Sequence, residues 1–206
     1  MRLRRGADGF TLVELLVAIV ILGIISLPLS NVVIGYFRNT DATTARLIES
    51  HDAQISSAYW AQDVASIGTR STTAPYPLNQ SVWKGASSLY SCSTAGTPIV
   101  SLAWDDFTST GTRTVVQVVY VAQTVSGQTE LHRVRCQGSP AMVSDVTLAH
   151  DLSTTPTVAC GTSGVDNNCA AAPDVLKFVT LTLTIKDPKN PGAPYVVNLT
   201  GQRRQS

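Results

Sequence analysis

A single carboxylate near the start of a long apolar run is the feature that most limits what this chain can fold into. Glu14 is the one charged residue between Phe10 and Phe37. An ionised side chain inside the hydrocarbon core of a bilayer costs roughly 2.5–3.5 kcal/mol. A plain membrane anchor has no reason to accept that cost. A helix that later packs beside copies of itself does, because Glu14 can then meet a positive charge.

The residues before this run form a short hydrophilic leader. Residues 1–9 contain three arginines, at positions 2, 4 and 5. A secretory signal has its cleavage site after the apolar stretch, whereas the small residue at the junction here, Gly9, comes before it. A cut between Gly9 and Phe10 would keep the helix on the mature chain. The new amino group of Phe10 would lie about one helical turn from Glu14, since residues i and i+4 share a helix face.

These residues carry a family resemblance. The string Gly-Phe-Thr-Leu-Val-Glu-Leu-Leu-Val-Ala, residues 9–18, resembles the processing and methylation signature of type IV prepilins and type II secretion pseudopilins. The resemblance implies that a prepilin peptidase cuts after Gly9 and methylates the new N-terminal Phe10. It also implies that Glu14 governs assembly with other pilin subunits on an inner-membrane platform. The alternative is a single-pass anchor whose Glu14 reaches the lipid headgroups, which explains neither the glycine nor the carboxylate.

The same segment predicts a membrane topology. Residues 10–37 supply the roughly 20 apolar residues that span a bilayer. The leader arginines favour a cytoplasmic N-terminus under the positive-inside rule. We therefore expect everything after about Arg38 to lie outside the cytoplasmic membrane, and at the cell surface once a pilus or pseudopilus has formed. Pro28 has no N–H and is expected to kink the helix or open it locally.

A helical pattern continues beyond the apolar run. Residues 39–67 contain no Pro or Gly, and apolar residues recur at helical intervals at Ala45, Ile48, Ile55 and Tyr59. We expect this stripe to face a core, with His51 and Asp52 on a solvated face beside it. The predicted division is a leader (1–9), a transmembrane and polymerisation helix (10–37), its amphipathic continuation (38–68) and an extracytoplasmic β-rich domain (69–206).

The rest of the chain has the pattern of a β domain. The predicted strands cover residues 99–104, 114–121, 129–135, 145–152, 179–185 and 195–200. The turn at Ser126-Gly127 predicts a hairpin, and residues 179–185 alternate apolar residues with threonine, which predicts one buried face. Outside these strands, residues 137–173 read as loops. The predicted fold class is α+β, with a long N-terminal helix packed on an antiparallel sheet, as in pilins.

Four cysteines lie in the part assigned to the outside of the membrane. An even number of cysteines in an oxidising compartment indicates disulfides. Three pairings are open, and we favour Cys160–Cys169 as a local loop with Cys92–Cys136 as the second bridge. A zinc site is the rival, but the chain has no Cys-x-x-Cys pair and no histidine at ligand spacing.

The composition argues against an enzyme and against nucleic acid as a partner. The net charge is +1; the leader, with three arginines and Asp8, carries +2, so the remainder carries −1. Nucleic-acid-binding domains usually have a basic patch or a high pI. The histidines at 51, 132 and 150 are scattered, and no Gly-x-Ser-x-Gly elbow occurs. No cofactor is expected; calcium at residues 166–168, Asp-Asn-Asn, is the alternative to a plain Asx-rich loop, without the spacing of an EF-hand.

A weaker likeness concerns the predicted β-rich domain. Tyr120, then Leu131-His132-Arg133, then the closing segment 201–204 are similar to the J/W type of minor subunit, which implies a minor pilin that joins or primes a filament. The rival from another class is a binding module at a filament tip, an adhesin or DNA-uptake receptor. For DNA, a basic groove would be expected from Arg113, Arg133 and Arg135; the alternative, which we favour, is that these arginines lie on a solvated sheet face.

Overall fold

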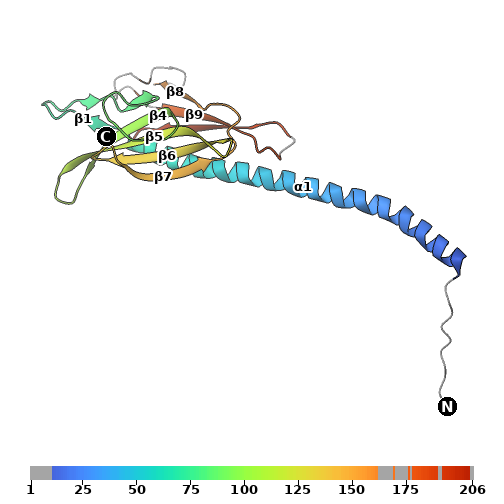
Figure 1. Ribbon diagram of the computed structural model, residues 1–206. Coiled ribbons are helices and arrows are strands. Elements are labelled where there is room, and N and C mark those ends of the chain that lie inside the picture. Colours follow the sequence, from blue (N-terminus) through green and yellow to red (C-terminus); the bar gives the residue numbers. More distant parts are fainter. Residues whose placement is uncertain (1–10, 162–168, 170–175, 177, 190–191, 205–206) are drawn as a thin grey trace, which may run out of the picture. The chain divides into compact units, whose positions relative to one another are not determined.

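The computed structural model describes residues 11–161, 169, 176, 178–189 and 192–204, and its elements are drawn in Figure 1. The chain divides into two compact units, Met1–Thr44 and Ala45–Ser206. The helix α1 (Leu12–Ser66) runs through both. The strands are β1 (Thr69–Arg70), β2 (Leu78–Asn79), β3 (Val82–Lys84), β4 (Thr97–Phe107), β5 (Arg113–Val125), β6 (Gln128–Gln137), β7 (Met142–Ala149), β8 (Thr157–Gly161), β9 (Phe178–Ile185) and β10 (Tyr195–Gln202).

In the first unit, α1 is an exposed apolar helix. None of residues 11–41 is buried, and α1 is long and apolar enough to cross a membrane. The helix passes Pro28 without interruption. Of the two alternatives expected for this residue, local opening is therefore wrong, and a kink stays a prediction. Nearby hydroxyls bond to the helix backbone: the Ser26 Oγ donates to the carbonyl of Leu22 at 2.8 Å, and the Ser30 Oγ donates to that of Ser26 at 2.9 Å.

The second unit contains two larger antiparallel sheets and a small hairpin. One sheet has the order β3-β4-β5-β6-β7, the other has the order β10-β9-β8, and β1 pairs with β2. Strand β9 alternates strictly between buried and half-buried residues. This confirms the alternation expected for residues 179–185, whose threonines lie on the outer face. The hairpin at Ser126-Gly127 is also present, as the turn between β5 and β6.

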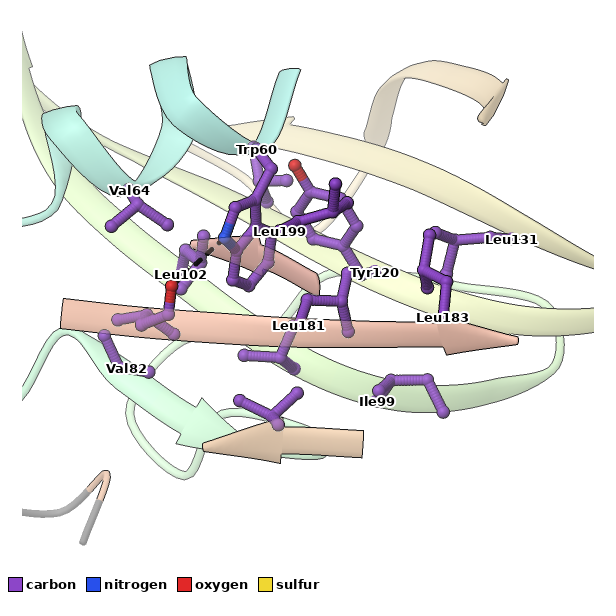
Figure 2. Close-up of a cluster of buried hydrophobic side chains, with 14 of the residues drawn as sticks. Trp60, Val64, Val82, Ile99, Leu102, Tyr120, Leu131, Leu181, Leu183 and Leu199 are labelled. Atoms are coloured by element: carbon purple, nitrogen blue, oxygen red, sulfur yellow. Dashed lines mark hydrogen bonds between the residues drawn. The ribbon is translucent and has the colours of Figure 1, made fainter. Parts of the chain in front are cut away.

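Both larger sheets and the end of α1 contribute to one core (Figure 2). Trp60 of α1 lies at its centre: its ring meets that of Tyr120 edge-on with centroids 5.0 Å apart. Its Nε1–H donates to the carbonyl of Val179 at 3.1 Å. Every buried residue that the structure describes lies at or after Ala45, so the second unit has a core of its own.

The buried face of α1 is unexpectedly polar. Five residues spaced three or four positions apart, which places them on one helix face, each form a hydrogen bond with the β structure. They are Glu49, Asp52, Ser56, Trp60 and Asp63. The apolar stripe predicted for this face is therefore only partly right. Ala45 is buried and Ile55 and Tyr59 pack against the core, but Ile48 is 42% exposed.

The prediction for Asp52 was wrong. Its side chain is buried, because Oδ2 accepts a hydrogen bond from the backbone N–H of His150 at 2.8 Å and pairs with the ring Nδ1 of His150 at 3.0 Å. A carboxylate can be buried when such donors replace its water. The loop prediction for residues 137–173 was also wrong at one place. Strand β8 forms there because Val158 and Cys160 point inward while the strand pairs with β9.

Two disulfides close the second unit. Cys92 bonds to Cys136 and Cys160 bonds to Cys169, which is the pairing favoured from the sequence. The first bridge ties the segment after β3 to strand β6. The second closes a loop with a sequence separation of 9 residues. Most of that loop, including the candidate calcium residues 166–168, lies outside the described residues.

Strand β10 packs unusually close to α1 at Gly201. A Cβ at this position would lie 2.5 Å from the Cβ of Val64 and 2.8 Å from both of its methyl carbons. Non-bonded carbon atoms do not approach this closely without a clash, so only glycine lets the strand and the helix pack at this distance.

Candidate processing and assembly site

The start of α1 positions Glu14. Thr11 precedes the first helical residue, and its backbone carbonyl accepts hydrogen bonds from the N–H groups of Glu14 and Leu15 at 3.1 and 3.2 Å. The Thr11 Oγ1 also accepts from the N–H of Glu14, at 3.3 Å. This is one half of a capping box, in which Ser or Thr caps the helix and Glu follows three residues later. The cap fixes where the helix begins and places Glu14 in its first turn.

The expected cleavage residues, Gly9 and Phe10, lie outside the described residues. The helix that begins just after them still constrains their chemistry. A free amino group on Phe10 would sit at the N-terminal end of α1, where the helix dipole is positive and disfavours another cation. Glu14 is the acid in the first turn of this helix. Its carboxylate, which lies on the exposed surface of the first unit, is therefore the natural counter-charge.

Comparison with known families finds a match at the N-terminal segment. The sequence matches the prokaryotic N-terminal methylation motif over residues 4–30, a range that contains Gly9, Phe10 and Glu14. The N-terminal segment is that of the type IV pilin and pseudopilin family. Pilins of this kind are structural, non-enzymatic subunits, processed by a peptidase and assembled with other subunits. The pilin motif and the apolar helix fit an anchor in the membrane. A search of curated proteins found no match to the chain.

A second cluster of ionisable residues lies in the second unit, Ala45–Ser206, which we call the head. The carboxylate of Asp63, on α1, accepts hydrogen bonds at 2.7 Å from Nε and Nη2 of Arg133 and at 2.7 Å from the Tyr120 hydroxyl. The guanidinium also lies 5.0 Å from the ring centroid of Tyr59, within range of a cation–π interaction. The Asp63 and Arg133 side chains are 2% and 9% exposed. This cluster joins α1 to β5 and β6 and has the closed, fully paired arrangement of a structural element.

The cluster removes Arg133 from the expected DNA groove. Arg133 was expected on a solvated sheet face, but it is buried and paired with Asp63. Arg113 is likewise paired, through Nη2, with Asp105 at 2.8 Å, and Arg135 bonds to the side chain of Gln137 at 2.9 Å. The three arginines do not form a free basic groove among the described residues.

The histidines do not share a site either, within the part of the chain that the structure describes. His51 is exposed on α1, and His150 bonds to Asp52. His132 lies between two acids, with Nδ1 2.9 Å from Asp145 and Nε2 3.2 Å from Glu130.

The buried cluster makes a prediction about alkaline pH. Burial raises the pKa of Tyr120 well above its usual value of 10.0, and the negative charge of Asp63 and its hydrogen bond raise it further. The folded head therefore keeps the phenol proton when the unfolded chain loses it at about pH 10. The contribution to stability is complete below that pH and is lost as the pH rises above it, by about 1.4 kcal/mol per pH unit. Urea unfolding of residues 45–206 at pH 9 to 11 should show this slope, and Tyr120→Phe should reduce it. An unchanged slope in the variant would contradict the assignment.

Sequence reasoning missed some of these residues. The Thr11-x-x-Glu14 pattern is a recognised helix-start signal and could have been read. The partners of Asp63 could not be found from the sequence, because Tyr120 and Arg133 are 57 and 70 positions away along the chain.

Proposed function

We propose that this pilin is a minor subunit of a type IV pilus-like filament. In this proposal a prepilin peptidase cuts between Gly9 and Phe10 and methylates Phe10. The precursor lies in the cytoplasmic membrane with its N-terminus inside and its head outside, and the assembly platform then moves α1 into the filament. The observation that carries the proposal is the exposed apolar half of α1 with a single capped carboxylate, Glu14, in its first turn.

Charge pairing between chains explains why the apolar segment contains a carboxylate. The ammonium group of Phe10 in one subunit pairs with Glu14 of its neighbour, so that each charge offsets the desolvation of the other. The surrounding apolar side chains, such as those of Leu16 and Ile19, are 57% and 61% exposed in the single chain. Packing against neighbouring helices gives them a partner other than lipid.

The test is to remove the carboxylate while keeping the helix. Glu14→Ala should leave the membrane-bound amount unchanged and reduce incorporation into sheared filaments by about 100-fold, as expected when a buried charge worth about 3 kcal/mol loses its partner. Glu14→Gln keeps the side-chain size and should be as defective. Thr11→Ala removes the cap hydroxyl but keeps both the Glu14 carboxylate and the backbone carbonyl that accepts from the N–H groups of Glu14 and Leu15, so it should still assemble. Incorporation of Glu14→Gln at the wild-type level would refute charge pairing.

A minor role is supported by the size of the head. The second unit, Ala45–Ser206, is a large domain to repeat along a whole filament, and the J/W-type likeness of Tyr120 and the closing strand points the same way. A display function at the filament tip is the second candidate. The head has an open groove, which favours this display function.

A further inference from the structure

An open groove lies on the head between the segment that follows β1, the end of β4 and the start of β5. Its cavity measures about 500 Å³, within the range of small-ligand sites. Its lining includes Arg70, Thr72, Tyr76, Asp105, Phe107 and Arg113. We call it the distal groove, because β1 starts three residues after α1 ends. That end of α1 is about 32 Å along the helix from Ala45, where the head begins.

Two aromatic rings border the distal groove and face water. Tyr76 is 55% exposed and Phe107 is 62% exposed, although neither ring is needed for the core. Tyr76 has a φ of 58°, a conformation that costs a non-glycine residue of order 1 kcal/mol and recurs at ligand-binding sites. Its backbone is held there by a hydrogen bond from its N–H to the carbonyl of Thr73 at 2.8 Å and by one from Nη1 of Arg70 to its own carbonyl at 3.3 Å.

The charge of the groove is positive. The side chain of Asp105 is 8% exposed and pairs with Nη2 of Arg113 at 2.8 Å, so these two charges cancel and Asp105 fixes the guanidinium in place. Arg70 is exposed and has no carboxylate partner among the residues that the structure describes. Its Nη1 donates to the Tyr76 carbonyl, which leaves Nε and Nη2 available to an anion, and these two groups can bind a carboxylate in a bidentate manner.

The backbone around the groove is already hydrogen-bonded. The N–H of Arg70 donates to Asp105 Oδ2 at 2.8 Å, and the carbonyl of Arg70 accepts from Arg113. The N–H of Ser71 donates to the carbonyl of Pro77 at 2.8 Å. A peptide that binds by adding a strand needs a free strand edge, and β1 does not offer one. Recognition must come from rings, hydroxyls and guanidinium groups.

A second hollow adjoins the distal groove across Arg113. It measures about 430 Å³, and Arg113 lines both. Leu89, Tyr90 and Gln117 are among its other residues. Two hollows with a shared arginine suit a ligand with repeated units.

We propose that the distal groove binds an acidic polysaccharide, with a uronate carboxylate on Arg70 and the C–H faces of sugar rings on Tyr76 and Phe107. Arg113 and the hydroxyl of Thr72 meet sugar hydroxyls, and the chain extends past Arg113 into the second hollow. A sugar fits the groove better than a peptide does, because it carries the carboxylate and the flat apolar face in one residue and needs no backbone pairing. This inference depends on no step of the assembly mechanism.

The test uses the full-length protein in detergent and calorimetry with oligogalacturonate chains of two to six units. Affinity should rise with chain length. Arg70→Gln and Phe107→Ala should each weaken binding about 10-fold, which is the effect of losing roughly 1.4 kcal/mol. The matched controls, Lys186→Gln and Tyr195→Ala, replace an exposed cation and an exposed ring elsewhere and should bind as wild type does.

Three results would overturn the proposal. One is unchanged binding by both groove variants, and another is no binding of the uronate chains at all. The third is binding of oligoglutamate, an acidic peptide, as tight as that of the uronate chains. Neutral oligoglucose should bind at least 10-fold more weakly than the uronate chains, and equal binding would remove the assigned role of Arg70. Filament incorporation of Arg70→Gln should stay at the wild-type level, so failure here and failure of the Glu14 mechanism are distinguishable.

Discussion

Replacing Gly9 with valine should abolish removal of the leader. In the proposed processing step the peptidase brings its catalytic groups to the Gly9–Phe10 bond, and the branched side chain of valine would occupy the space through which they approach. The intact mass of the membrane protein should then include residues 1–9, and Phe10 should carry no methyl group. The variant should also be missing from filaments, because no free ammonium group on Phe10 reaches a neighbour's Glu14.

The leader contains its own control. Gly6→Val makes the same change three residues earlier, away from the proposed cleavage bond. This variant should be processed and assembled as wild type. Complete processing of Gly9→Val, or equal failure of both variants, would contradict the position of the cut.

Asp63→Ala is expected to lower the free energy of unfolding of the head by about 3–5 kcal/mol, because it leaves the buried Arg133 without a counter-charge. The Tyr120 hydroxyl loses its acceptor in the same change. Small domains are stable by about 5–15 kcal/mol in total, so this is a large fraction. Urea unfolding of residues 45–206, with both disulfides intact, measures it directly.

Two comparisons separate the buried pair from an ordinary surface contact. Asp145→Ala removes a carboxylate that is 33% exposed and pairs with His132, and it should cost less than about 1 kcal/mol. Asp63→Leu combined with Arg133→Met replaces both charges by apolar groups and should recover most of the stability lost in Asp63→Ala. A double variant as unstable as the single variant would show that the cost lies in packing and not in the unpaired charge.

The fold was largely predictable where local patterns dominate. The absence of Pro and Gly from residues 39–67 predicted the continuation of α1, and the alternation in residues 179–185 predicted β9 and its buried face. The disulfide Cys160–Cys169 followed from short loop closure. These features depend on residues that are close in sequence, and a single chain displays them without an alignment.

The buried polar face of α1 could not be predicted in this way. Periodicity ranks residues by hydrophobicity, and acids such as Glu49 and Asp63 are counted as solvated. They are buried because distant segments bring donors to them: the N–H of Asp187 to Glu49 and the guanidinium of Arg133 to Asp63. The distal groove could not be predicted either. Arg70, Tyr76 and Phe107 lie in turns and strand ends that carry no motif.

The polar face of α1 also bears on how the head withstands tension. The hydrogen-bonding residues from Glu49 to Asp63 are spread over about 21 Å of the helix. A pull along the helix axis would strain all of these contacts at the same time, instead of breaking them one after another as in unzipping. If the helix is drawn while the head is held, the force is divided among several elements, from the loop after β9 to strand β6. This geometry would let the head stay folded under a load that no one of these bonds could resist alone.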